Sequence, residues 1–206
     1  FDLTGVDQII YSFLHLKGNE LAIDNDKDSL TLVNVVNQKK NYPNLKVLVS
    51  LGGWGGCESC SEVFSTEANR IAFAKSTAKI IDTYKADGID LDWEYPAISG
   101  YPGHKYQTED RENFTDLVVQ LRNFMKKGDI LSFAAGASTR FIENSIEWDK
   151  VMPLVDNVNL MTYDFYGSGS SKTGHHTALS DNEFQKRSAE SSINALINKG
   201  VDPKQI

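Results

Sequence analysis

The middle of the chain, residues 87–95, reads Asp-Gly-Ile-Asp-Leu-Asp-Trp-Glu-Tyr. From residue 89 onward large apolar residues alternate with acids, and this two-residue period is typical of a β-strand. Side chains two residues apart lie on one face of a strand, so Asp90, Asp92 and Glu94 are expected to share a face. At about 3.3 Å rise per residue, neighbouring acids stand roughly 7 Å apart. Because ionised carboxylates repel one another, at least one is expected to keep a proton near neutral pH.

The alternative explanation, without a functional role, is that the acids form a solvated face of an edge strand. Two observations argue against it. The flanking sequence is apolar, with Ile80 and Ile81 before the acids and Pro96 and Ile98 after them. Asp is also a poor strand former, so its repetition within a strand needs another reason. The pattern therefore indicates a group of acids that is kept for proton-transfer chemistry.

Short apolar, β-branched runs alternate with segments of helical period along the rest of the chain. Strands are expected over 9–16, 46–51, 88–95, 130–137 and 158–163, and helices over 67–85, 109–126, 147–155 and 181–199. Strict alternation predicts an α/β fold with parallel strands and right-handed crossovers. A doubly wound sheet and a (β/α)8 barrel both satisfy this pattern.

Two features favour the barrel over the doubly wound sheet. The Gly-x-Gly-x-x-Gly motif of dinucleotide-binding sheets is absent after the first expected strand. Polar residues also stand at or just past the ends of three expected strands, namely Ser50, Glu94 and Asp164. Active sites of barrels gather at the carboxyl ends of the strands, so these residues are expected to share one site.

Composition limits the possible partners. The chain has 206 residues, enough for one sizeable core, and carries a formal net charge of −7. An acidic balance argues against nucleic acid and against an anionic membrane surface, since both require clustered Lys and Arg. No apolar run approaches the length of a membrane-spanning helix.

The two cysteines, Cys57 and Cys60, are spaced Cys-x-x-Cys. One such pair supplies only half of a structural zinc site, and no second pair exists. The rest of the sequence does not fit a thioredoxin-like chain. A small surface disulfide is favoured over two free thiols, provided that the compartment is oxidising.

Residues 87–94 resemble the Asp-Gly-x-Asp-x-Asp-x-Glu signature of glycoside hydrolase family 18, the chitinases. Residues 50–53, Ser-Leu-Gly-Gly, match the family's Ser-x-Gly-Gly motif, and residues 161–164, Met-Thr-Tyr-Asp, match its Met-x-Tyr-Asp motif. The resemblance spans Ile9 to Ile206. It implies a (β/α)8 TIM barrel, of which residues 1–206 form a partial catalytic domain covering about strands 2 to 6 with their helices. The first and the last two barrel strands are expected to be missing.

The resemblance implies a chitinase that hydrolyses β-1,4-linked N-acetylglucosamine polymers with retention, by substrate-assisted catalysis. Glu94 corresponds to the general acid. Asp92 corresponds to the residue that holds the acetamido N–H, and Asp90 to its inner partner that shares a proton with it. Tyr163 and Asp164 correspond to groups that grip the acetamido oxygen and the sugar.

Other residues near the three motifs are expected to support the acids, to bind sugar or to lie in the core. Ser50 is expected either to support Asp90 by a hydrogen bond or simply to pack. Trp54 and Tyr95 are candidate stacking platforms for sugar rings, whereas Phe13 and Trp93 are expected in the core or at the floor of the site, and Trp148 in the core. The substrate-binding set is Asp164, Tyr95, Met161, Trp54, Phe13 and Ser50.

No metal or cofactor is expected. His104, His175 and His176 stand in loops without carboxylate or Cys at ligand spacing, so they are interpreted as solvated. The expected partner is chitin or chitooligosaccharide, and the protein is expected to be a secreted monomer.

Two other functions remain open. An endo-β-N-acetylglucosaminidase acting on N-glycans shares the same acids, although the Trp-Glu-Tyr-Pro run at 93–96 favours a chitinase. A catalytically inactive chitin-binding lectin is the third possibility. Lectins that resemble this family usually lack the acid corresponding to Glu94, and this chain keeps it.

Overall fold

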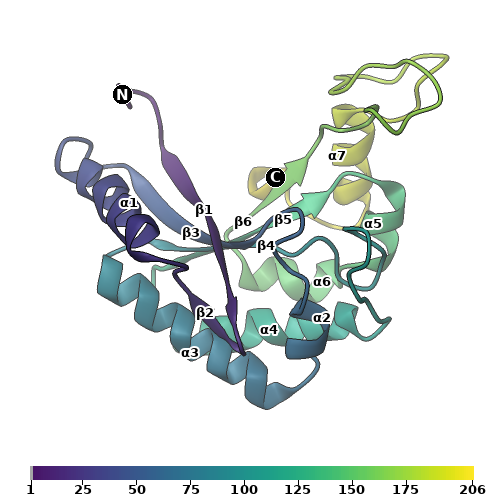
Figure 1. The fold of residues 1–206 in the computed structure, drawn as a ribbon. Coiled ribbons are helices and arrows are strands. Elements are labelled where there is room, and N and C mark those ends of the chain that lie inside the picture. The colour runs from purple at the N-terminus through teal and green to yellow at the C-terminus, as the bar shows by residue number, and fades with distance from the viewer. Residues whose placement is uncertain (1) are drawn as a thin grey trace.

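The computed structural model describes residues 2–206 and contains one six-stranded sheet in the order β2-β1-β3-β4-β5-β6 (Figure 1). Neighbouring strands are parallel except β2, which pairs antiparallel with β1. The strands are β1 Gln8–Lys17, β2 Glu20–Ala22, β3 Lys46–Gly52, β4 Gly88–Asp92, β5 Ile130–Gly136 and β6 Asn157–Met161.

The order of the parallel strands identifies the type of sheet. A doubly wound sheet reverses its strand order at a switch point. Here each parallel strand lies beside the next one in the sequence, from β1 through β6, without reversal. This is the arrangement of consecutive strands in a (β/α)8 barrel, as the sequence predicts.

Helices follow most of the strands and cover the outer side of the sheet, with α3 and α4 lying along it in Figure 1. They are α1 Asp26–Asn37, α2 Cys60–Val63, α3 Glu67–Tyr84, α4 Asp110–Phe124, α5 Thr139–Asn144, α6 Trp148–Val151 and α7 Ala189–Asn198. Short 3₁₀ turns span Gln38–Lys40, Met152–Leu154 and Pro203–Gln205. None of the described helices is long and apolar enough to cross a membrane.

The expected helices over 67–85 and 109–126 are confirmed within two residues at each end. The prediction of a helix over 181–199 is wrong in its first part, because α7 begins at Ala189. Before it, the Asn182 side chain accepts hydrogen bonds from the backbone N–H of Phe184 and Gln185. Such local bonds offer the backbone a turn in place of a helix. Residues 162–188 instead form a long loop that projects from the sheet (Figure 1).

Four elements were not predicted: α1, α2, α5 and β2. Helix α1 ends in Val35, Val36 and Asn37, which have low helix propensity. Its start is fixed by Asn25, whose side chain accepts from two backbone N–H groups. The other three elements have six residues or fewer, too short for a period to be recognised.

The central strand β4 ends at Asp92, three residues earlier than predicted. Its neighbour β3 ends at Gly52, which pairs with Asp92, and the N–H of Gly53 donates to the Asp92 carbonyl oxygen. Beyond this point the ladder has no partner strand. Trp93 instead packs its ring against Phe64 and Phe114 in the core.

The two faces of β4 divide as the alternation predicts. Ile89, Leu91 and Trp93 are buried in the hydrophobic core between the sheet and the helices. Trp148 is also confirmed as a core residue, since its ring is buried and its N–H donates to the Ile142 carbonyl oxygen at 2.7 Å. The acids of β4 therefore lie on the inner face of the sheet.

The fourth acid of the segment, Asp87, has a structural role. It precedes β4, where its carboxylate accepts from the N–H of Val47 at 2.8 Å and from Lys39 Nζ at 2.7 Å. These bonds tie the start of β4 to the start of β3. Asp87 therefore belongs to the opposite end of the strand from Glu94.

Gly88 begins β4 where no larger residue fits. A Cβ atom at this position would lie 1.9 Å from the carbonyl oxygen of Ile130 on β5. We expect Gly88→Ala to lower the free energy of unfolding by about 1–3 kcal/mol, because the two strands must move apart. Urea denaturation measures the effect. Gly167→Ala is the matched control, since nothing lies within 4 Å of the added methyl group, and equal losses for both variants would contradict the expectation.

Cys57 and Cys60 form a disulfide with a Cα–Cα distance of 5.2 Å. The predicted disulfide is confirmed, but its predicted position at the surface is wrong, because Cys57 is 4% and Cys60 0% exposed. The bond closes the turn that leads from β3 into α2, and both cysteines are buried.

Candidate active site

Asp90 lies at the bottom of the inner face of the sheet, and three neighbouring strands donate hydrogen bonds to it. Ser132 Oγ on β5 donates at 2.6 Å and Asn159 Nδ2 on β6 at 2.8 Å, both to Oδ1. Ser50 Oγ on β3 donates to Oδ2 at 3.3 Å. Burial raises the pKa of Asp90, and the three hydrogen bonds lower it again in part. The hydrogen bond from Ser50 to Asp90 that the sequence analysis expects is present.

Asp92 stands one step closer to the end of the strand and has an unsatisfied oxygen. Its Oδ1 is buried and has no hydrogen-bond partner among the described residues. Burial raises the pKa of Asp92 to about 7, with further contributions from the negative charges of Glu94 and Asp90. Buried polar atoms are nearly always paired, so this oxygen is a candidate acceptor for a hydrogen bond from a ligand.

Glu94 lies two residues past the end of β4, and its side chain is buried. Burial raises the pKa of Glu94, and the negative charge of Asp164 raises it further. A carboxyl group that keeps its proton toward neutral pH can act as a general acid. The Glu94–Tyr95 peptide bond that follows is cis.

Two adjoining hollows cover these acids. The larger has a volume of about 570 Å³, and its wall includes Asp90, Asp92 and Ser50. The smaller, of about 150 Å³, includes Glu94, Tyr95 and Asp164. Met161 and Tyr163 line both hollows, so the two lie side by side at the carboxyl ends of the strands, and together they are called the depression. A reacting bond between the hollows would have Glu94 on one side and Asp92 on the other.

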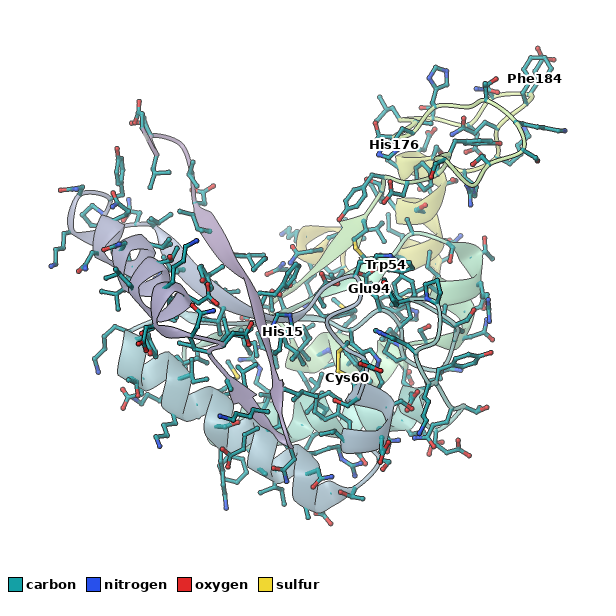
Figure 2. All side chains as sticks on the ribbon, in the orientation of Figure 1. His15, Trp54, Cys60, Glu94, His176 and Phe184 are labelled. Atoms are coloured by element: carbon teal, nitrogen blue, oxygen red, sulfur yellow. A yellow bond between two sulfur atoms is a disulfide. The ribbon has the colours of Figure 1, made fainter. Side chains whose placement is uncertain are left out.

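The structure also places the expected aromatic residues. Phe13 is 37% exposed and lines the larger hollow, so it does not lie in the core. Trp54 is exposed and lies near Glu94 (Figure 2), with its ring centroid 6.4 Å from that of Tyr95. Tyr163 is half exposed above the acids. Each has a ring surface available for a ligand.

The side chain of Asp164 lies beside that of His176. His176 Nε2 lies 3.3 Å from Asp164 Oδ1, and its Nδ1 lies 3.2 Å from the carbonyl oxygen of Tyr166. His176 is 56% exposed, in agreement with its interpretation as a solvated loop residue. His104 contacts the ring of Tyr101 at a centroid distance of 4.8 Å. Within residues 2–206 no group of three or more His, Cys, Asp or Glu is arranged to hold a metal ion.

Sequence reasoning missed two residues of the site, Ser132 and Asn159. The sequence around these two residues gives little indication that they contact Asp90. Asn159 is one of two asparagines at alternate positions of a short apolar strand, and Ser132 is a single hydroxyl within an apolar run. Their partner Asp90 lies 42 and 69 residues away in the sequence.

Asn159 is expected to contribute to stability through Asp90. Asn159→Ala removes one donor from a buried carboxyl group, and we expect a loss of about 1–3 kcal/mol in the free energy of unfolding. Urea denaturation at pH 7 measures this loss. Asn194→Ala, at an exposed position of α7, is the control and should change stability little. Equal stability of the two variants would show that the Asp90 bond is dispensable.

The chain is similar to proteins of known family and structure. The model of the family "Glycosyl hydrolases family 18" matches residues 1–206. Chitinase A1 of Niallia circulans is 37% identical over 155 residues, covering 71% of this chain and 22% of that protein. The chitinase domain of the spore coat protein CotE from Clostridium difficile superposes with a TM-score of 0.91 at 33% identity, over 100% of this chain and 60% of that one.

A third similar protein was solved with a ligand. It is a mutant of catalytic domain 2 of the Group II chitinase from Ostrinia furnacalis, in complex with a penta-N-acetylchitooligosaccharide, (NAG)5. Its TM-score is 0.88 at 30% identity, over 97% of this chain and 54% of that one. The chain thus spans about a fifth of the curated relative named above and little more than half of these two structures.

Proposed function

Since this chain belongs to glycosyl hydrolase family 18, we propose that the protein hydrolyses β-1,4 links between N-acetylglucosamine units of chitin. The observation that carries the proposal is the pair of acids on either side of the depression. One is a buried Glu94 with a raised pKa, and the other is Asp92 with a buried, unpaired oxygen.

In the first step Glu94 gives its proton to the glycosidic oxygen, and the bond from that oxygen to the anomeric carbon breaks. The carbonyl oxygen of the sugar's own 2-acetamido group attacks the anomeric carbon, forming an oxazolinium ion. No protein nucleophile is needed. Water then opens this ring from the face that the leaving group occupied, Glu94 takes back a proton, and the product retains its configuration.

Asp92 supports this chemistry through its unpaired Oδ1. That oxygen is available to accept a hydrogen bond from the acetamido N–H, and the negative charge of Asp92 then stabilises the positive charge that develops on the oxazolinium ring. Asp90 lies beneath Asp92 on the same face of β4, and its charge contributes to the raised pKa of Asp92. In this proposal the two carboxyl groups share one proton during turnover.

Tyr163 and Asp164 complete the proposed binding site for the reacting sugar. Both line the smaller hollow with Glu94, and Tyr163 also faces the larger one that contains Asp92. Asp164 adds negative charge near Glu94 and so helps to keep the acid protonated. Phe13, Trp54 and Tyr95 present rings at the edges, where sugar faces stack, and Met161 and Ser50 shape the floor.

The substrate class rests on the complex of the Ostrinia furnacalis chitinase domain with (NAG)5. The test is to incubate the intact protein with chitohexaose and, separately, with a high-mannose glycopeptide, and to identify products by mass spectrometry. Cleavage of chitohexaose is expected. Release of glycan from the glycopeptide alone would show an endo-β-N-acetylglucosaminidase instead, and binding without cleavage of either would show a lectin.

We further propose that the protein is secreted and acts as a monomer. The Cys57–Cys60 disulfide supports secretion, because such bonds persist in oxidising compartments. Detection of the protein in the culture medium, and its mass in solution by light scattering, test the two points.

A further inference from the structure

A row of aromatic rings leads away from the acids across the outer rim of the site. The ring of Trp54 lies 6.4 Å from that of Tyr95 and 5.5 Å from that of Tyr101, and Tyr101 lies 4.8 Å from the ring of His104. Trp54 is 59% exposed and Tyr101 is 39% exposed. Rings this exposed add little to the core, so their exposure calls for another role.

The row ends at a separate hollow. This third hollow, distinct from the two over the acids, has a volume of about 480 Å³ and lies between α2 and the loop of residues 101–107. Its wall carries His104 and the half-exposed ring of Tyr106, together with the polar side chains of Ser61, Ser65 and Gln107. Glu62 and Lys105 face one another across it at 3.6 Å, and they balance each other's charge.

Buried polar bonds hold the wall of this hollow in place. Asp110 is fully buried and accepts from Ser61 Oγ at 2.9 Å and from the N–H of Gln107 at 2.9 Å. Gln107 Nε2 donates to the Ser61 carbonyl oxygen at 3.0 Å. These three bonds fasten the loop to α2, so a ligand would meet a surface that is already ordered.

The row itself is also braced. The Cys57–Cys60 disulfide closes the turn between Trp54 and α2. The ring of Tyr101 lies against Gly55, where a Cβ atom would come within 3.2 Å of it. A side chain at residue 55 would therefore press on the ring of Tyr101.

The combination of ring faces, hydroxyls and amides without net charge suits a neutral sugar polymer. Aromatic rings offer a large rigid surface at low entropic cost, and hydroxyl and amide groups satisfy the sugar's own polar groups. A nucleic acid would require a basic surface, which this hollow lacks. The ring contacts from Tyr95 through Trp54 and Tyr101 to His104 connect it to the acids, and they indicate which polymer reaches it.

We propose that Tyr101, His104 and the hollow beside α2 form an additional binding site for N-acetylglucosamine units of the same chain that is cleaved at Glu94. This inference rests on the proposed function and adds to it a binding site for sugar units that lie away from the cleaved bond. The site would hold units remote from the reacting bond, so it distinguishes long chains from short ones. Long substrates gain affinity from it, and substrates that fill only the depression at the acids gain none.

The variants Tyr101→Ala and Tyr106→Ala test the site separately. Each is expected to lower kcat/KM for chitohexaose about three- to tenfold, the loss that corresponds to one aromatic contact. Neither should alter kcat/KM for a chromogenic chitobioside. Phe184→Ala is the control, because Phe184 is exposed at the far end of the projecting loop (Figure 2) and should leave both substrates unaffected.

The outcomes separate this site from simpler explanations. Equal losses on the hexamer and the chitobioside would mean that Tyr101 only supports Trp54, and unchanged values on both would mean that the hollow binds no sugar; either result overturns the proposal. Tyr101→Phe should restore the hexamer rate. Circular dichroism checks that each variant is folded.

The proposal is also tested without turnover. Calorimetry on the Glu94→Gln protein should give a Kd for chitohexaose that rises three- to tenfold on adding Tyr106→Ala, while the Kd for chitobiose stays constant. If the wild-type protein cleaves neither substrate, the proposed function fails. The calorimetric difference still decides whether the hollow binds the polymer, and its absence refutes the site.

Discussion

Glu94→Gln is expected to lower kcat on chitohexaose about 10²- to 10⁴-fold, the usual contribution of a general acid. Gln keeps the size and the hydrogen-bonding oxygen of Glu but has no proton to give to a leaving oxygen. Because the rest of the depression is unchanged, the Kd for the oligosaccharide should stay close to that of the wild type. Initial rates by chromatography and binding by calorimetry measure the two quantities.

The control for this variant is Glu109→Gln, a change of the same chemistry at an exposed position beside α4. It should leave kcat unaltered. If Glu94→Gln turned over at the wild-type rate, Glu94 would not be the acid and the assignment of the whole site would have to be abandoned.

Asp92→Asn is expected to have two opposite effects. Activity should fall by at least about 10²-fold, because the carboxylate that stabilises the positive oxazolinium ring is replaced by a neutral amide. Stability at alkaline pH should rise. The second effect follows from the pKa of Asp92, which burial and the charges of Glu94 and Asp90 raise to about 7 from its ordinary 3.8.

The direction of the pH dependence follows from proton linkage. Between pH 4 and pH 7 the folded protein binds a proton at Asp92 that the unfolded chain has lost, so rising pH destabilises the fold. A difference of about three pKa units corresponds to about 4 kcal/mol at pH 8. Asn carries no charge at any pH, and Asp92→Asn should recover that free energy at pH 8 and little at pH 4.

Urea denaturation of the wild type and Asp92→Asn at the two pH values measures this effect. Asp149→Asn, on the exposed side of α6, is the matched control and should shift stability equally at both. An Asp92→Asn protein that was no more stable than the wild type at pH 8 would mean that Asp92 is not strained by its surroundings.

The sequence predicted the features that depend on a local period. Alternation along residues 88–94 correctly separated buried Ile89 and Leu91 from the acids opposite, because the two-residue period is a property of the extended backbone itself. The succession of strands and helices likewise predicted the parallel sheet. These features require no knowledge of what lies far away in the chain.

Features that depend on contacts between distant parts of the chain could not be predicted from the sequence. Nothing near Ser132 or Asn159 in the sequence indicates that both donate to Asp90, because the sheet alone brings them together. The start of α7 was misplaced for a related reason. Residues 181–188 carry a single large apolar residue, Phe184, so no period marks the boundary, and the bonds made by Asn182 and Ser188 fix a turn and a helix cap there.

The aromatic row could be predicted only in part. Trp54 stands beside a recognisable motif, whereas Tyr101 lies in a loop with no periodic pattern. Its contact with Gly55 depends on how two separate loops meet above the strand ends. Residue type alone suggested a platform at Trp54 but not the surface that continues from it.

Asp90, finally, limits how this protein can be engineered for heat resistance. Replacing a buried polar cluster by well-packed apolar residues often raises the melting temperature of a protein. Here the cluster joins β4 to β3, β5 and β6 and lies directly beneath Asp92. A redesign of that layer would gain stability only by giving up the proposed reaction, so stabilising substitutions belong on the outer helices, away from the strand ends.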